Sequence, residues 1–132
     1  MWGEHMIGLI IFVFIGGFTG ATIREFIMLS TPPMSDGFPL DIFVANVSAS
    51  FLLGYATGHH RGSRITKEQI LLFGTAGLGG MSTFSSFTFG AISEFNKPDG
   101  LWISIVYVLA SITVGFIAVY LGMKLAEDRK VD

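Results

Sequence analysis

The sequence contains no cysteine and few charged residues. Its 132 residues include eight Lys and Arg and ten Asp and Glu. Without cysteine there can be no disulfides and no thiolate metal sites. The net charge of −2 is too small to indicate nucleic-acid binding. The first residues, MWGEH, lack the basic stretch that opens a cleavable signal peptide, so we expect the first apolar run to be retained.

Apolar residues, by contrast, are abundant and gathered into long runs. Four such runs cover residues 6–23, 42–58, 69–95 and 101–123. A helix of about 20 residues crosses the hydrocarbon of a bilayer, and a chain in lipid has to pair its own backbone polar groups. We therefore predict an all-α membrane protein in which residues 1–132 form one domain of four transmembrane helices.

The segments between the runs fit short connections. Residues 30–39, STPPMSDGFP, hold three of the four prolines and predict a turn-rich loop. Thr66 and Gln69 have the spacing of a capping box, which predicts the start of the third helix. Residues 96–100, NKPDG, predict a short turn before the fourth helix.

Small residues and basic residues indicate how the helices pack and are oriented. The pairs Gly16/Gly20 and Gly54/Gly58 are spaced so that helices can approach closely. With four spans, both termini and the second connection share one side. That side carries six basic residues, whereas the other carries only Arg24 and Lys97. By the positive-inside rule the termini should be cytoplasmic.

The third run is interrupted by polar and flexible residues, in the stretch GLGGMSTFSSF at 77–87. Each glycine costs a helix interior about 1 kcal/mol relative to alanine, and four of them, Gly74, Gly77, Gly79 and Gly80, fall within seven positions. We therefore predict a broken third helix, with Ser82 and Thr83 capping a second half-helix. Unwound backbone at membrane depth needs protein or a water-filled cavity around it, and such breaks commonly form ion sites.

The second half-helix carries rings and hydroxyls on nearby positions. Phe84 and Phe87 are three apart and share a face. The positive edge of a phenyl ring can be presented to an anion, and hydroxyls stand close by on Ser82, Ser85 and Ser86. The alternative is that both rings are core packing and that the serines bond back to their own helix.

Two other runs contain isolated polar groups. Asn46 lies in a span without charges, where it should face the protein interior or an aqueous path; interhelical hydrogen bonding is the alternative. Tyr107 and Ser111 lie four apart, on one face of the fourth helix. Three helices thus contribute neutral hydrogen-bonding groups.

The chemistry of this set favours passage of an anion. A proton-coupled transporter would need a carboxylate within a span, whereas Asp41 and Glu94 stand at span ends. No histidine, carboxylate or serine–histidine arrangement supports catalysis, so we do not expect an enzyme. Neutral donors and phenyl edges suit dehydration of a small anion. Arg24 could attract one to a vestibule, or could be an interfacial anchor.

These residues resemble the Fluc (CrcB) fluoride channels. The resemblance is carried by GLGGMSTFSSF at 77–87, GATIREF at 20–26, Asn46, and the Tyr107/Ser111 pair. It covers essentially the whole chain in the same helix order.

The resemblance implies an antiparallel, dual-topology dimer in the inner (plasma) membrane, with pores at the dimer interface. Fluoride would leak out of the cytoplasm passively, which gives fluoride resistance. Backbone carbonyls of Gly79 and Ser82 from both subunits would hold a central structural sodium ion. The implied fluoride pathway comprises Arg24, Asn46, Phe84, Ser85, Ser86, Phe87, Tyr107 and Ser111.

The chain departs from the family pattern at a few positions. Asp41 and Ile42 stand where the family usually has Gly-Thr, Gly90 where members often have glutamate, and Gly115 where a second serine is usual. These are the places where we expect the pore to differ.

Alternatives remain for the partner and for the function. We favour a homodimer because the principal motif is intact, but the six-to-two basic bias also fits one half of a heterodimeric fluoride channel. A small multidrug-type transporter would need a glutamate in the first helix, and none lies between Met6 and Ile23. A membrane scaffold subunit is the remaining alternative.

Overall fold

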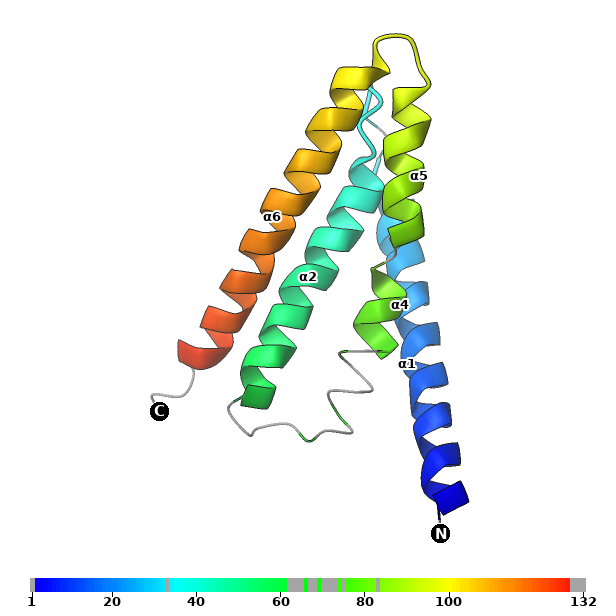
Figure 1. Ribbon diagram of the computed structural model, residues 1–132, viewed down its shortest axis with the longest axis vertical. Coiled ribbons are helices and arrows are strands. Elements are labelled where there is room, and N and C mark those ends of the chain that lie inside the picture. Colours follow the sequence, from blue (N-terminus) through cyan, green and yellow to red (C-terminus); the bar gives the residue numbers. More distant parts are fainter. Residues whose placement is uncertain are drawn as a thin grey trace.

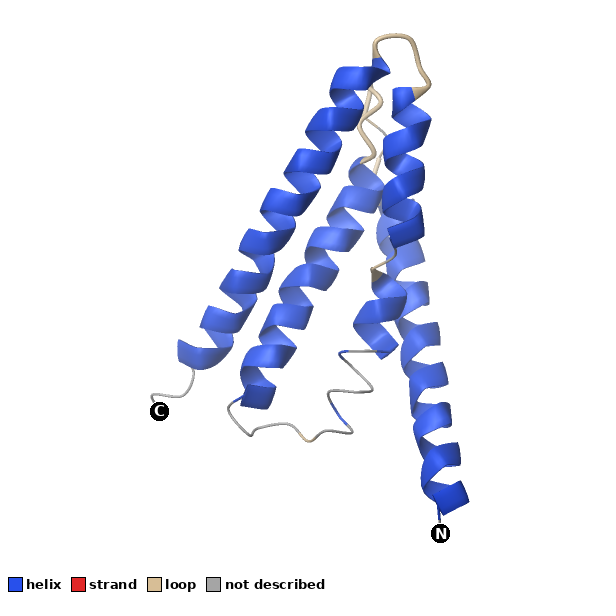
Figure 2. Ribbon diagram, viewed as in Figure 1, coloured by secondary structure: helices blue, strands red, loops and turns tan. Residues whose placement is uncertain are grey.

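The structure is a computed structural model that describes residues 2–32, 34–61, 66, 69, 74, 76–82 and 84–128. All the regular elements in these residues are helices (Figure 2). They are α1 (Trp2–Ser30), α2 (Leu40–Arg61), α4 (Gly79–Met81), α5 (Phe84–Phe95) and α6 (Gly100–Asp128).

Three of these helices are long and apolar enough to cross a membrane. They are Met6–Ser30, Leu40–Arg61 and Gly100–Asp128, so the predicted first, second and fourth spans are confirmed as helices. Each helix is longer than its apolar run. The run ends where charged or polar residues leave the hydrocarbon, but such residues do not stop a helix, and α1 continues through Arg24 to Ser30.

The capping box predicted at Thr66 and Gln69 is confirmed. The backbone N–H of Thr66 donates to Gln69 Oε1 over 2.9 Å, and the Gln69 N–H donates to Thr66 Oγ1 over 3.3 Å. This reciprocal pair is a capping box, and it satisfies two donors that a helix start leaves unpaired.

The chain changes conformation between α4 and α5. Helix α4 ends at Met81, Ser82 has an extended backbone (φ −101°, ψ 123°), and α5 begins at Phe84. The Ser82 N–H donates to the Leu78 carbonyl over 2.9 Å, which closes the last turn of α4. That these helices belong to one interrupted membrane span stays a prediction, because residues 67–68, 70–73, 75 and 83 lie outside the described residues.

Helices α2 and α6 lie side by side along most of their length (Figure 1). Glycines make this approach possible. A Cβ atom at Gly54 would overlap the backbone of Val119, one at Gly122 would overlap the Phe51 carbonyl, and one at Gly58 would stand 2.7 Å from the Ala126 Cβ. The close-packing role predicted for Gly54/Gly58 is therefore confirmed.

Helix α4 packs on α1 through a second set of glycines. A Cβ at Gly20 would overlap the Gly77 carbonyl, and a Cβ at Gly80 would lie 2.5 Å from the Gly17 carbonyl oxygen. The glycine cluster of the third run thus lets the backbone of α4 and the residues before it contact the backbone of α1. This packing role is additional to the helix-breaking role predicted from the number of glycines.

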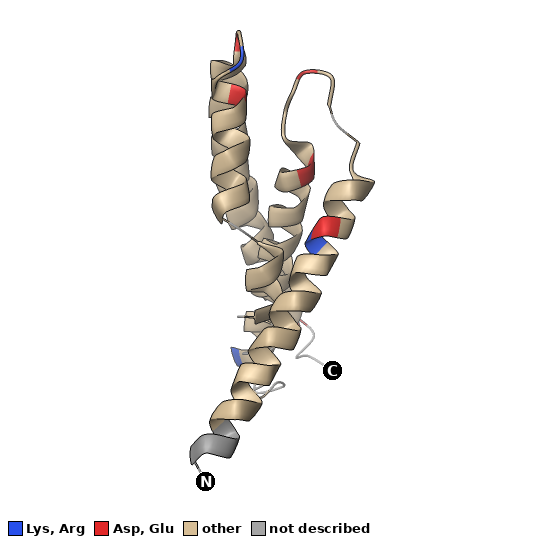
Figure 3. Cartoon of the chain, turned by 90° about the vertical axis from the view of Figure 1, so that its right-hand side faces the viewer, with Lys and Arg blue, Asp and Glu red and all other residues tan. Residues whose placement is uncertain are grey.

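The helices carry their charges near the ends, while their lengths are almost uncharged (Figure 3). Large apolar side chains are exposed along α1 and α6, among them Phe14, Phe26 and Phe116. Such exposure would be unfavourable in water but is the expected surface toward lipid. The chain is therefore a multi-pass membrane protein.

The α5–α6 turn follows a buried carboxylate at the end of α5. Glu94 is 5% exposed, and its Oε1 accepts a 2.6 Å bond from the half-exposed Lys97 ammonium. Asp99 takes a left-handed conformation (φ 62°), and the Gly100 N–H donates to the Lys97 carbonyl. The predicted short turn at 96–100 is confirmed.

Candidate functional site

Five of the predicted site residues line one open pocket of about 210 Å³, which we call the track pocket. It is formed by Asn46 of α2, Phe84 and Phe87 of α5, and Ser111 and Ile112 of α6, with Ser82 between α4 and α5. The fold thus brings together the neutral polar groups that the sequence places on three separate helices.

The rings of α5 and α6 form a continuous aromatic row. Phe84 and Phe87 lie with ring centroids 6.0 Å apart, which confirms that they share a face. Phe87 lies 5.5 Å from Tyr107, and Phe38 meets Tyr107 edge-on at 5.6 Å. Phe84 is 80% exposed whereas Tyr107 is fully buried, so the row runs from the surface of the chain into its interior.

Tyr107 and Ser111 bring unused hydrogen-bonding capacity to this region. Their hydroxyls are neighbours, but neither meets hydrogen-bond geometry with any atom of the described residues. A buried hydroxyl without a partner costs about 1–3 kcal/mol. Unpaired buried groups in a native structure are often functional or satisfied by a water or an ion.

Gly90 leaves the space that Tyr107 occupies. A Cβ atom at Gly90 would lie 3.2 Å from the Tyr107 hydroxyl and 3.3 Å from Ile42 Cδ1. A larger residue on α5 would therefore press on both side chains. Ile42 is buried in the space beside Gly90. The departures from the family pattern at these two positions are therefore explained together, because the small Gly90 leaves room for Ile42.

Ser85 and Ser86 line a different pocket, of about 350 Å³, which we call the Asp41 pocket. Its other lining residues are Met28 of α1, Asp41 and Ile42 of α2, and Phe89 of α5. Six of the eight predicted pathway residues thus line two pockets on either side of α5, and Asp41 joins Ser85 and Ser86 in the second.

Gly79 and Ser82 line a third pocket, of about 370 Å³, beside α2. We call it the break pocket, because it lies where α4 ends. Both residues are exposed in the single chain. Since Ser82 also lines the track pocket, the two pockets meet at the extended residue between the helices.

Arg24 is partly buried on α1 and lines none of these three pockets. Its Nε is buried without a hydrogen-bond partner in the described part of the chain. Arg24 therefore lies outside these pockets, one helical turn before Met28 of the Asp41 pocket.

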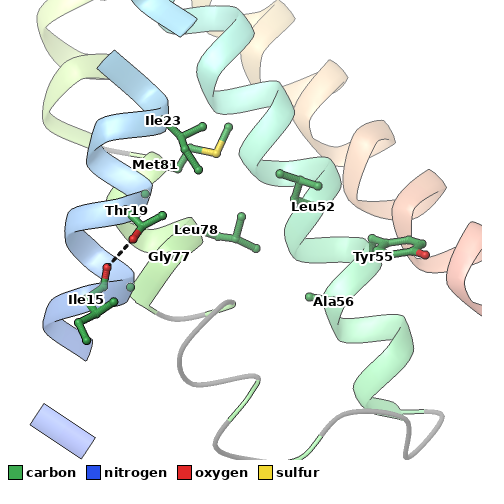
Figure 4. Close-up of a pocket in the computed structure, with 11 residues that line it drawn as sticks. Ile15, Thr19, Ile23, Leu52, Tyr55, Ala56, Gly77, Leu78 and Met81 are labelled. Atoms are coloured by element: carbon green, nitrogen blue, oxygen red, sulfur yellow. Dashed lines mark hydrogen bonds between the residues drawn. The ribbon is translucent and has the colours of Figure 1, made fainter. Parts of the chain in front are cut away.

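An apolar pocket of about 360 Å³ separates α1 from α2 on the side of α4 (Figure 4). Ile15, Thr19 and Ile23 line it from α1, Leu52 and Tyr55 from α2, and Met81 from α4. The Thr19 hydroxyl donates to the Ile15 carbonyl of its own helix over 2.8 Å, so it adds little polarity to the pocket.

Sequence reasoning did not identify Phe38 as a neighbour of Tyr107. Phe38 lies in the connection before α2 and packs on Phe43 as well as Tyr107. No local signal predicts this contact, because Tyr107 lies on α6, far along the chain from the SDG turn.

Comparison with known proteins identifies the family. The model of the CrcB family, described as CrcB-like protein, Camphor Resistance (CrcB), matches residues 11–123. The chain belongs to the CrcB family. The match includes every candidate site residue named above, and it confirms the resemblance predicted from the motifs.

Curated relatives within the CrcB family are similar over most of the chain. The protein "Fluoride-specific ion channel FluC 3" of Yersinia pseudotuberculosis is 51% identical over 125 residues, 95% of this chain and 93% of the relative. "Fluoride-specific ion channel FluC" of Pyrococcus horikoshii is 35% identical over 90% of this chain and 96% of the relative. "Fluoride-specific ion channel FluC 1" of Brucella abortus is 46% identical over 92% of this chain, which spans about half the length of that relative.

Proposed function

We propose that this chain forms a fluoride-selective channel through which cytoplasmic fluoride leaves passively, giving fluoride resistance. The main support is the 51% identity to a relative named as a fluoride-specific ion channel, over 95% of this chain. The relatives' names describe ion channels, which agrees with the expectation that the chain is not an enzyme.

The proposed ion path follows the track pocket. Asn46 and Ser111 offer neutral donors there, and Phe84 and Phe87 offer ring edges. The unpaired hydroxyls of Tyr107 and Ser111 would donate to a dehydrated anion, which replaces part of its lost hydration. Ser85 and Ser86 would extend the path into the Asp41 pocket, and Arg24 would act at a distance as an electrostatic attractant.

The path needs a second wall. Phe84 is 80% exposed and the track pocket is open in the single chain, so a narrow pore requires a partner subunit. A two-fold dimer places the same surface twice at one interface. We therefore propose an antiparallel homodimer in the inner membrane with the pores at its interface; pairing with an oppositely inserted homologue is the alternative.

Sodium fits the chemistry of the break pocket. Hard cations favour backbone carbonyl oxygens, and Gly79 and Ser82 are exposed at the end of a helix, where carbonyls lose their intrahelical partners. We propose that carbonyls of both residues, from two subunits, hold a central sodium ion. The ion would join the two subunits at their broken helices.

Fluoride resistance in living cells tests the proposal against the scaffold alternative. In a bacterial strain that lacks its own fluoride exporters, the chain should restore growth in millimolar-range fluoride, and Asn46→Ala should lose that rescue at equal expression. A scaffold subunit would restore nothing, or would act equally well with Asn46→Ala.

Reporter fusions at the C-terminus test the dimer. An antiparallel homodimer requires reporter signal on both sides of the membrane from one sequence. Signal on the cytoplasmic side alone would exclude the homodimer and leave the heterodimer.

A further inference from the structure

Asp41 places a carboxylate beside two residues of the proposed fluoride path. It lies in the first turn of α2 and lines the Asp41 pocket together with Ser85 and Ser86. The remaining lining residues are Met28, Ile42 and Phe89, so none of the described lining residues supplies a compensating positive charge.

The carboxylate also lies close to the interior of the path. Ile42, the residue after Asp41, and the buried Tyr107 hydroxyl both border Gly90, where a Cβ atom would lie 3.3 Å from Ile42 Cδ1 and 3.2 Å from the hydroxyl. The pocket that Asp41 lines is therefore next to the inner end of the aromatic row. An acid in the first turn of a helix stabilises the helix dipole, but that role alone does not require a place in this pocket.

We infer that Asp41 is an electrostatic barrier at one mouth of the pathway and sets the rate and the pH dependence of fluoride conduction. The inference rests on the proposed function and adds a rate-determining residue to it. A negative side chain in a pocket with apolar walls repels an approaching anion more strongly than it would in open water. Protonation removes the charge and with it the repulsion.

Such a barrier would suit the way in which fluoride enters cells. Acid converts fluoride into neutral HF, which crosses the bilayer and ionises again inside the cell. A carboxylate that loses its charge in acid lowers the barrier under the conditions in which most fluoride enters.

The other charged and titratable groups near the pocket are few. Helix α1 contributes Met28 to the lining and carries Arg24 and Glu25 one turn earlier, while α6 contributes the Tyr107 phenol from the interior. The α5 residues of the lining are serines and a phenylalanine. Asp41 is thus the only carboxylate among the described residues that line this pocket.

Fluoride currents across planar bilayers provide the test, because neutral HF crosses without carrying current. The readout is the ratio of current at about pH 3 to current at about pH 7.5, at equal fluoride-ion concentration in the same membrane; these values lie on either side of the ordinary carboxyl range, and the ratio cancels differences in channel number. For the wild type we expect a rise of roughly threefold to tenfold on acidification.

The variants separate charge removal from general disturbance. Asp41→Asn should conduct at the acid-level rate at both pH values, with a ratio near one, and its advantage at neutral pH should shrink as salt screens the repulsion. Asp41→Glu should keep the wild-type ratio. Glu25→Gln is the matched control, since it removes one negative charge from an exposed position at the same end of the bundle and should leave the ratio unchanged.

Three results would overturn the inference. One is a wild-type fluoride current that does not change with pH, which can be read even if Asp41→Asn does not assemble. Another is an Asp41→Asn channel that responds to pH as the wild type does, and the third is a Glu25→Gln channel that loses the response. Absence of any wild-type fluoride current would instead contradict the proposed function itself.

Discussion

Phe87 of α5 lies against Tyr107 of α6, with ring centroids 5.5 Å apart and an angle of 31° between the ring planes. This contact joins the exposed Phe84 to the buried hydroxyls of Tyr107 and Ser111. The row passes from a surface that is exposed in the single chain to unpaired polar groups through rings alone. In the proposed dimer it forms one wall of the ion path.

Replacing Phe87 with isoleucine should reduce fluoride flux while leaving the protein assembled. The ring edge that faces the anion is lost, but an apolar side chain of similar bulk remains. Aromatic interactions of about 0.5–1.5 kcal/mol correspond to a loss of up to about tenfold in rate. Phe116→Ile, on the exposed surface of α6, is the matched control and should conduct normally. Equal flux from both variants would show that the rings only pack.

Tyr107→Phe should lower flux without lowering stability. The hydroxyl has no hydrogen-bond partner in the described part of the protein, so its removal should change the unfolding free energy by less than about 0.5 kcal/mol or stabilise slightly. A hydrogen bond to a charged species is worth about 1.5–3 kcal/mol, so flux should fall about tenfold or more. Thermal stability in detergent and liposome flux would be measured on one preparation. A large stability loss with normal flux would assign the hydroxyl a structural role.

Gly54→Ala should weaken the α2–α6 contact. The added Cβ would overlap the Val119 backbone, which cannot move aside as a side chain could. Overpacking of this kind costs about 1–3 kcal/mol, and we expect a lower melting temperature in detergent. Gly8→Ala on α1 is the control, because its Cβ would meet nothing within 4 Å; it should be neutral or slightly stabilising. A melting temperature unchanged by Gly54→Ala would contradict the close approach of these helices.

Lys97→Met should destabilise the α5–α6 turn because it leaves the Glu94 carboxylate buried without its ion pair. Lys97 is itself half exposed, so the pair as such contributes little; the expected cost of about 1–3 kcal/mol comes from the unpaired group. The double variant Glu94→Gln/Lys97→Met should recover most of the lost stability. Equal melting temperatures for the single and double variants would exclude this explanation.

The positions of the helices along the chain could be predicted because they follow from the distribution of apolar residues. Apolar runs marked three helices correctly, and the spacing of Thr66 and Gln69 marked a capping box that the structure contains. The ends of α1 and α6 do not follow from the apolar runs, since charged residues such as Arg24 and Lys124 leave the hydrocarbon but remain helical.

The site could be predicted only in part. Asn46 and Ser111 are predicted from their polarity within apolar spans, and Phe84 and Phe87 from their shared helix face; all four line one pocket. Their separation from Ser85 and Ser86 follows from the helical period, which puts positions 84 and 87 on the opposite face of α5 from 85 and 86; which pocket each face borders depends on how the helix is rotated in the bundle. The contact of Phe38 with Tyr107 depends on the path of the connection before α2. Neither that rotation nor this contact is set by local sequence.

Fluoride release from liposomes that contain only this purified protein tests the central claim most directly. A potassium gradient with valinomycin would drive efflux, and a fluoride electrode would record it. The account predicts rapid fluoride release while chloride is retained, with one sequence sufficient for the dimer. Intact, well-folded protein that releases no fluoride, alone or together with a co-expressed homologue, would contradict it.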